Sequence, residues 1–224
     1  MKILVIAAHP DDEILGCGGT IARLVKEGNE AYTLILGEGV TARDDKRDTN
    51  VRNDEINSLK EQMNKANEII GVKEVITEDV PDNRFDSVDL LDIVKKIEKI
   101  KDRINPDVIF THYCNDLNID HKITAGAVLT ATRPMVGETV KEIYSFEILS
   151  STEWNYPLTF SPNTYFDISK TIDLKTEAMK QYKSEIRNYP HPRSVEGIEL
   201  SANYWGVRTG LKCAEAFELI RCTK

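Results

Sequence analysis

The sequence predicts an α/β fold, a doubly wound and mostly parallel sheet of the Rossmann-like type with helices on both faces. Three observations favour this fold. Apolar runs without alternation recur along the chain, as in strands that are covered on both faces. Segments with helical periodicity lie between these runs, and each ends at a Gly or Pro signal. Strand and helix alternate from the first residue, which is typical of parallel strands joined by right-handed crossovers.

The regular elements are clearest in the first half of the chain. The expected strands are the apolar runs at residues 3–8, 32–36 and 108–110, with a further strand ahead of Pro81. The expected helices have apolar residues three or four positions apart and end before Gly28, Gly71 and Asn105. After Pro134 the pattern weakens, and it favours strands near residues 141–148 and 165–168, a helix from Asp173 to about Ile186 and a turn at 190–192. Since no linker-like segment separates these parts, we expect a single domain over residues 1–224.

The composition is typical of a globular protein that does not bind nucleic acid. The 224 residues are 41% hydrophobic and 29% charged, and the net charge of -8 disfavours contact with a polyanion. The cysteines form no Cys-x-x-Cys motif, so neither a disulfide framework nor a zinc knuckle is indicated. No apolar run is long enough for a signal peptide or a membrane span. We expect a soluble, cytoplasmic protein, and the sequence leaves a homo-oligomer open.

A polar segment follows the first predicted strand. Residues 9–13 read His-Pro-Asp-Asp-Glu, so one loop supplies an imidazole and up to three carboxylates. The carboxyl ends of parallel strands are the places where such folds bind their ligands. A catalytic zinc takes about three protein ligands, typically imidazole and carboxylate, and keeps an open position for water. The segment therefore indicates part of a metal site.

A second polar segment follows the strand predicted at residues 108–110. It contains His112, Asp120 and His121. If the two strands are parallel, both segments meet at one edge of the sheet. Three of the 4 histidines lie in these segments beside carboxylates, a distribution that packing explains poorly. We therefore expect one site built from both segments.

Other interpretations of these residues stay open at this point. His9 and His121 could be hydrogen-bonded histidines, and the acidic run could be a helix start, because acidic side chains are favoured there. Cys114 could be a soft metal ligand, although a packed cysteine is more common. His112 either takes part in catalysis or only ends its strand.

Residues 8–13, Ala-His-Pro-Asp-Asp-Glu, and the Asp-His pair at 120–121 resemble the motifs of the PIG-L/LmbE-like family of zinc-dependent de-N-acetylases. The Gly-x-Gly-Gly sequence at 16–19 matches as well, and weaker similarity extends to residues 190–194 and 214–217. The resemblance covers most of the chain. It implies removal of an N-acetyl group from an amino sugar or an amino-sugar conjugate, such as a nucleotide-linked one.

The resemblance also implies roles for individual residues. His9, Asp12 and His121 would bind one Zn²⁺ per chain, for which another divalent metal could substitute, and Asp11 would be the general base. Such a metal lowers the pKa of its water to about 7, so that Asp11 could take the proton. Asp120 is next to His121 and is expected to accept a hydrogen bond from that imidazole, which fixes its tautomer.

The chain departs from the family pattern at Asn118. Many relatives carry a histidine three residues before the ligand histidine, where this chain has asparagine. An asparagine side chain donates hydrogen bonds but cannot shuttle a proton. The proton for the leaving amine would then come from His112, from His191 or from protonated Asp11.

The sequence says less about which residues bind the substrate. Arg84, in a turn after the third predicted strand, and Arg193 could each meet a phosphate or carboxylate of the substrate. Asn118 and His191 could line the same pocket. Residues 37–50 could form a substrate loop, although their charge run is more typical of solvated surface.

Three other functions compete with a deacetylase. Dinucleotide binding is disfavoured, because Ile21 occupies the place of the third glycine and three carboxylates precede the helix. A metal-dependent phosphoesterase would suit the aspartates and histidines, but it would need more ligands for two metals. The third alternative is a metal-stabilised binding domain without turnover.

Overall fold

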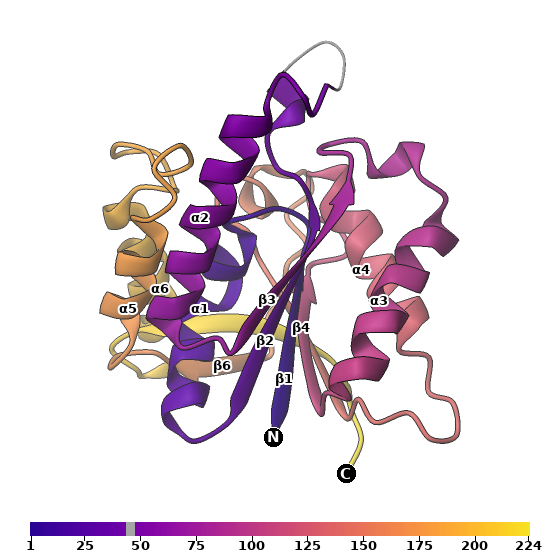
Figure 1. Cartoon of the computed structure of the whole chain (residues 1–224). Coiled ribbons are helices and arrows are strands. Elements are labelled where there is room, and N and C mark those ends of the chain that lie inside the picture. Colours follow the sequence, from indigo (N-terminus) through magenta and orange to yellow (C-terminus); the bar gives the residue numbers. More distant parts are fainter. Residues whose placement is uncertain (44–47) are drawn as a thin grey trace.

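The computed structural model describes residues 1–43 and 48–224, and its centre is a seven-stranded sheet in the order β3-β2-β1-β4-β5-β7-β6 (Figure 1). The strands are β1 (Lys2–Ala7), β2 (Glu30–Gly37), β3 (Glu74–Val80), β4 (Val108–His112), β5 (Glu142–Phe146), β6 (Thr164–Asp167) and β7 (Ala214–Cys222). β1 is parallel to β2 and β4, and β3 and β5 continue the parallel part outward. β7 runs antiparallel to β5 and β6. The predicted mostly parallel sheet is confirmed.

Helices cover both faces of this sheet, as Figure 1 shows. They are α1 (Asp12–Lys26), α2 (Asn53–Ile70), α3 (Leu90–Ile104), α4 (Ile119–Ala131), α5 (Ile172–Met179) and α6 (Val195–Thr209), with short 3-10 turns η1 (Thr41–Arg43), η2 (Phe85–Ser87) and η3 (Thr152–Trp154). Ile3 and Val5 of β1 share a core with α1, α2 and α5, whereas Leu4 and Ile6 share one with α3 and α4. Burial on both faces is why this strand shows no polar alternation.

Helix ends follow the stop signals in the sequence. Gly71 and Asn105 adopt the left-handed conformation at the ends of α2 and α3, with φ angles of 82° and 57°. This conformation is common at helix C-termini and easiest for glycine and asparagine. The predicted ends of both helices are therefore confirmed.

Two glycines of α1 allow it to lie close to β5 and to the residue that follows β6. A Cβ atom at Gly16 would overlap the ring of Phe146, and one at Gly19 would press on Ile168. Glu215 of β7 accepts hydrogen bonds from the backbone amides of Gly19 and Thr20, at 3.0 and 2.6 Å. The Gly-x-Gly-Gly sequence therefore serves the packing of α1 within the fold.

The C-terminal third differs from the prediction. The helix expected from Asp173 to about Ile186 is too long, since α5 ends at Met179. The chain leaves the helical path because Tyr182 is fully buried with its hydroxyl donating to Glu13, and the amide of Lys183 donates to Gln62 of α2 at 2.8 Å.

The sequence patterns also fail to predict α6 and β7. Apolar residues on α6 face solvent as well as the core, with Leu200, Tyr204 and Val207 all more than half exposed. A helix with apolar residues on several sides lacks the single stripe on which periodicity arguments depend.

The candidate substrate loop at 37–50 lies partly outside the described residues, because these do not include 44–47. In its described part, Val40 is buried and the amide of Ala42 donates to Asp82 at 3.1 Å. Within 1–43 and 48–224, no helix combines the length and apolar character that crossing a membrane requires.

Candidate active site

The two polar segments meet at the carboxyl ends of β1 and β4. These adjacent strands lie where the chain order of the sheet reverses direction, which is the usual ligand-binding crevice of an open parallel sheet. β1 ends at Ala7 and α1 begins at Asp12, so His9 lies in the connecting turn. β4 ends at His112, and His121 lies in the first turn of α4. The sheet therefore brings the two segments onto one edge, as the sequence indicates.

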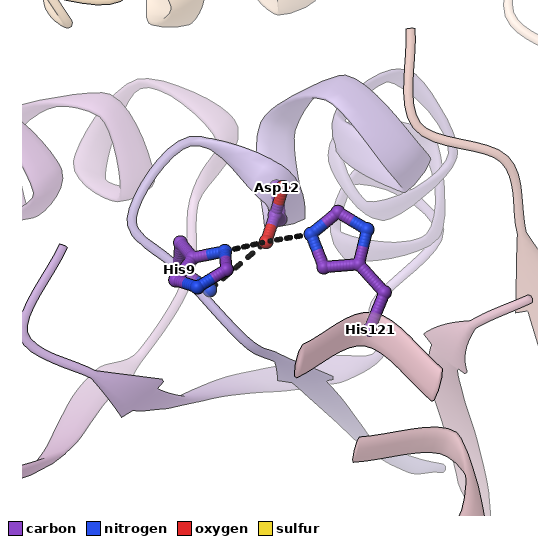
Figure 2. Close-up of side chains that lie close together, drawn as sticks. All are labelled: His9, Asp12 and His121. Atoms are coloured by element: carbon purple, nitrogen blue, oxygen red, sulfur yellow. Dashed lines mark hydrogen bonds and ion pairs between the residues drawn. The ribbon is translucent and has the colours of Figure 1, made fainter. Parts of the chain in front are cut away.

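His9, Asp12 and His121 form a compact set of side chains that could hold a metal ion, here called the metal-ligating set (Figure 2). Asp12 Oδ2 lies 3.4 Å from His9 Nδ1 and 3.3 Å from His121 Nε2. In a tetrahedral zinc site, metal–ligand bonds of about 2.0–2.1 Å place neighbouring ligand atoms about 3.3 Å apart. The donor types and their spacing both fit a divalent metal.

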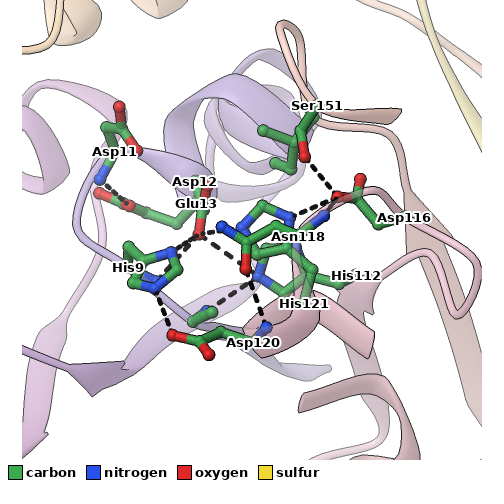
Figure 3. A network of polar contacts seen from close by, with 12 residues as sticks. His9, Asp11, Asp12, Glu13, His112, Asp116, Asn118, Asp120, His121 and Ser151 are labelled. Atoms are coloured by element: carbon green, nitrogen blue, oxygen red, sulfur yellow. Dashed lines mark hydrogen bonds and ion pairs between the residues drawn. The ribbon is translucent and has the colours of Figure 1, made fainter. Parts of the chain in front are cut away.

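A second set of possible ligands shares His9. The other imidazole nitrogen, Nε2, lies 2.9 Å from Asp120 Oδ2, as Figure 3 shows. The same nitrogen lies 3.4 Å from Asp82 Oδ1. Asp120 is held in place because its Oδ1 accepts from the amide of Phe85 at 3.0 Å. With Nδ1 facing Asp12, Nε2 carries the proton and donates to Asp120. Asp120 and Asp82 thus orient His9, and the first set is the better metal site.

The carboxylate that orients His121 is Asp116. His121 Nδ1 lies 3.0 Å from Asp116 Oδ1, and the hydroxyls of Ser151 and Thr152 donate to the same carboxylate. The sequence-based expectation that Asp120 would accept from His121 is wrong. Asp120 faces His9 instead, because the side chains of Asp120 and His121, neighbours in the first turn of α4, point in different directions.

The electrostatics of the set favour positive charge at the imidazole nitrogens. Burial opposes protonation of His121, but Asp12 and Asp116 raise its pKa above the usual value. Burial opposes ionisation of Asp12, yet the charge and hydrogen bond of His121 and the hydrogen bond of His9 hold its pKa well below the usual value. For Asp116, burial is outweighed by hydrogen bonds from His121, Ser151 and Thr152, and its pKa falls to about 2. A buried site that stabilises protonated imidazoles also favours a metal cation that takes the place of those protons.

Glu13 fixes the turn that carries these residues. Its Oε2 accepts from the backbone amide of Asp11 at 3.0 Å, and its Oε1 accepts from Asn67 of α2 at 2.9 Å and from Tyr182. Burial raises the pKa of Glu13 to about 7, against the hydrogen bonds that lower it. The bond to Asp11 is significant because Asp11 has a φ angle of 102°, a strained value for a residue other than glycine.

Asp11 itself is buried and pairs with Arg193 across the site. Arg193 Nη1 donates to Asp11 Oδ2 at 2.9 Å, and Arg193 Nε donates to Ser150 Oγ at 2.8 Å. Burial raises the pKa of the Asp11 carboxyl well above its usual value, and the charge of Arg193 opposes this shift. Arg193 thus lies in the site as the sequence predicts, but its partner there is the candidate base.

His112 lies behind the metal-ligating set. It is fully buried, its ring stacks on His121 with centroids 4.0 Å apart, and its Nε2 accepts from the amide of Ala8 at 2.8 Å. Burial and the neighbouring His121 lower its pKa well below the usual value. A neutral, enclosed imidazole that binds the end of β1 is suited to positioning. This geometry disfavours the expectation that His112 delivers a proton.

The remaining candidates lie around the rim. Asn118 caps α4, because its side-chain oxygen accepts from the amide of Asp120 at 2.8 Å, and its Nδ2 donates to Asn83 at 3.0 Å. His191 Nδ1 accepts from the amide of Arg193 at 3.1 Å. Arg84 is half-buried in the turn between β3 and η2.

Sequence reasoning missed the residues that support the ligands. Asp116 lies inside the second polar segment, so an acidic residue five positions before a ligand histidine is a signal that was available. Asp82, Asn67 and Tyr182 come from three separate parts of the chain and carry no motif of their own. Their roles depend on the fold.

The chain is similar in sequence to several known proteins. The model of the PIG-L family, described as GlcNAc-PI de-N-acetylase, matches residues 4–132, which is more than half of the chain. The uncharacterised deacetylase YaiS of Escherichia coli K12 is 29% identical over 81% of this chain and 90% of its own length. A probable N-acetyl-alpha-D-glucosaminyl L-malate deacetylase 2 of Bacillus cereus is 26% identical over 82% and 83%. The diacetylchitobiose deacetylase of Thermococcus kodakarensis is 25% identical over 98% and 83%.

Solved structures share the whole fold. The conserved protein TT1542 from Thermus thermophilus is 26% identical and has a TM-score of 0.78, over 99% of this chain and 96% of that protein. The 4-carboxy-2-hydroxymuconate hydratase GalB is 21% identical with a TM-score of 0.76, over 100% and 98%. The fold by itself therefore does not fix the reaction, and the match to the family model carries the assignment. On that match, the chain belongs to the PIG-L family of de-N-acetylases.

Proposed function

We propose that this protein is a zinc-dependent hydrolase that removes the N-acetyl group from an amino sugar or an amino-sugar conjugate. The observation that carries the proposal is the set of His9, Asp12 and His121, with the buried carboxylate of Asp11 beside it in the chain. Relatives named for glucosaminyl malate and for diacetylchitobiose support this substrate class.

Hydrogen bonds fix the tautomers of the two imidazoles that would bind the metal. Zinc, one per chain, would supply a Lewis acid for the amide carbonyl and lower the pKa of a water to about 7. Asp120 holds the Nε2 proton of His9, and Asp116 holds the Nδ1 proton of His121, so the other nitrogen of each ring is available as a ligand.

In this proposal Asp11 handles the proton in both directions. It accepts a proton from the attacking water and then donates it to the leaving nitrogen. Asn118 cannot carry a proton, and the Nε2 of His112 is engaged with the amide of Ala8. The Arg193 guanidinium, anchored on Ser150, keeps the Asp11 carboxylate in one direction. Arg84, Asn118 and His191 would contact the sugar at the rim.

The test is release of acetate from N-acetylglucosamine, N,N'-diacetylchitobiose and a glucosaminyl conjugate by purified protein. We expect a chelator to abolish release and zinc to restore it. Asp11→Asn should keep its zinc and lose at least about 100-fold in kcat, whereas His121→Ala should lose the zinc. His191→Gln should keep kcat within about threefold if Asp11 alone shuttles the proton.

Two results would contradict the proposal. An Asp11→Asn protein with full activity would exclude the assigned base. Two metals per chain together with release of phosphate from phosphoesters would support the phosphoesterase alternative, in which the set of His9, Asp82 and Asp120 would also bind metal.

A further inference from the structure

The turn η3 is connected to both halves of the candidate active site. Ser151 and Thr152 donate to Asp116, which orients His121. One residue earlier, Ser150 accepts from Arg193, which binds Asp11. On the other side of the turn, Asn155 Nδ2 donates to the carbonyl of Asn115 at 2.7 Å. A side chain on this turn is therefore held in a defined position relative to the metal-ligating set.

Trp154 is the side chain that this turn presents to solvent. Its exposed fraction is 55%, although an indole is among the largest apolar groups that a protein can bury. Its ring meets the ring of His191 edge to face, with centroids 5.7 Å apart and planes at 79°. His191 accepts from the amide of Arg193, and Arg193 binds Asp11. The indole thus lies at the rim of the site, separated from the candidate base by two side chains.

We propose that Trp154, supported by His191, is a stacking surface for a sugar ring of the substrate. The inference rests on the proposed function, since that function supplies a carbohydrate as the occupant. One face of a pyranose ring is lined by C–H groups, and an indole held by a short, well-anchored turn can cover that face at little entropic cost. The hydroxyls at the ring edge remain free for polar rim residues such as Asn118. Trp154 would determine substrate affinity and leave the chemical step unchanged.

Tryptophan fluorescence gives a direct test, because the chain has 2 tryptophans and Trp205 is only 7% exposed. The titration uses zinc-loaded Asp11→Asn protein, which should turn the sugar over at least about 100-fold more slowly, with N-acetylglucosamine and N,N'-diacetylchitobiose as probes. We expect a saturable change in fluorescence and protection from acrylamide quenching. Adding Trp154→Phe should remove the signal, and adding Trp154→Ala should weaken binding measured by calorimetry by about tenfold.

Kinetics on the active protein provide the second readout. Trp154→Ala should raise KM about tenfold, with kcat within about twofold and zinc content unchanged. The matched control is Tyr204→Ala, because Tyr204 is 56% exposed but lies well beyond the start of α6 at Val195, about 14 Å along the helix axis. It should leave KM unchanged. A larger effect on the disaccharide than on the monosaccharide would assign the stacked ring to the second sugar unit.

The two proposals fail in different ways. Acetate release that is unaffected by Trp154→Ala, or sugar binding without any fluorescence change, would overturn the stacking surface and leave the deacetylase intact. A fluorescence change that depends on protein concentration and not on sugar would also overturn it, because Trp154 would then contact a second copy of the chain. Saturable binding at Trp154 without acetate release from any sugar would overturn the proposed reaction and leave the stacking surface.

Discussion

Asp116 illustrates how one carboxylate can orient an imidazole that is proposed to bind a metal. It binds Nδ1 of His121 and is itself fixed by Ser151 and Thr152. The imidazole therefore presents Nε2 toward Asp12 in one orientation and one tautomer.

We predict that Asp116→Asn weakens zinc affinity by about 10- to 100-fold, because an amide can donate to Nδ1 and stabilise the wrong tautomer. Zinc affinity is measured by competition with a chromogenic chelator. Asp86→Asn, at an exposed position in η2, is the control and should bind zinc like the parent. Equal affinity of the Asp116 variant and the parent would contradict the role of Asp116.

Arg193 is a second residue whose role a conservative substitution can test. Its guanidinium reaches Asp11 and Ser150 at once, from Nη1 and from Nε. A lysine has a single ammonium group and cannot make both contacts in the same geometry.

We predict that Arg193→Lys lowers kcat by about 10- to 100-fold and changes KM by less than about threefold. The reason is that Asp11 loses its fixed direction while the substrate contacts remain. Arg187→Lys, at an exposed position on the same segment, should leave both constants unchanged. A raised KM with an unchanged kcat would instead support direct binding of the substrate by Arg193.

At the scale of elements, the position of α1 depends on small residues. Gly16 faces the ring of Phe146 on β5, and the space there admits no methyl group. At Gly126, in the middle of α4, no atom other than those of its chain neighbours and the helix backbone lies within 4 Å of the place where a Cβ would be. Both glycines lie within helices, but only Gly16 is required by the packing of a neighbouring side chain.

We predict opposite effects of alanine at these two glycines. Gly16→Ala should lower the free energy of unfolding by about 1–3 kcal/mol, because Phe146 or the helix must move. Gly126→Ala should raise it by about 0.5–1 kcal/mol, because alanine is the better helix former and nothing must move. Urea unfolding of both variants beside the parent measures the difference, and the same sign for both would refute the packing argument.

At the scale of the whole molecule, Glu147 connects the sheet to the C-terminal helix. It follows β5 and accepts a hydrogen bond from the indole nitrogen of Trp205 on α6. Burial raises the pKa of Glu147 to about 7, with Glu153 adding to the shift and Lys175 and Trp205 opposing it. The folded protein therefore binds a proton at this position at pH values where the unfolded chain has lost it.

This shift makes a pH-dependent contribution to stability. With a pKa of 4.5 for an unperturbed Glu and about 7 in the fold, the contribution is complete below pH 4.5 and is lost as the pH rises through 7. Glu147→Gln stays neutral and still accepts from Trp205. Its free energy of unfolding should therefore exceed that of the parent increasingly from about pH 5 to about pH 8, by at most about 3 kcal/mol. Urea unfolding at several pH values measures this difference, and a difference independent of pH would contradict the assignment.

The sequence by itself determined the fold class, the two polar segments that form the site, and the family. Buried strands must be apolar on both faces, and the strand ends of a parallel sheet must carry the polar residues, so local patterns suffice for these features. The motif at residues 9–13 and the Asp-His pair at 120–121 are contiguous, and the geometry brings them together on adjacent strands.

Only the tertiary structure decided which carboxylate orients which imidazole. The sequence favours Asp120 as the partner of His121 because the two are adjacent, but in the fold Asp116 binds His121 and Asp120 faces His9. The same holds for Arg193, which is 182 positions from Asp11 and contacts it because α6 begins beside the site. Hydrogen bonds between distant segments leave no periodic pattern in a sequence, since each depends on the path of the chain between its partners.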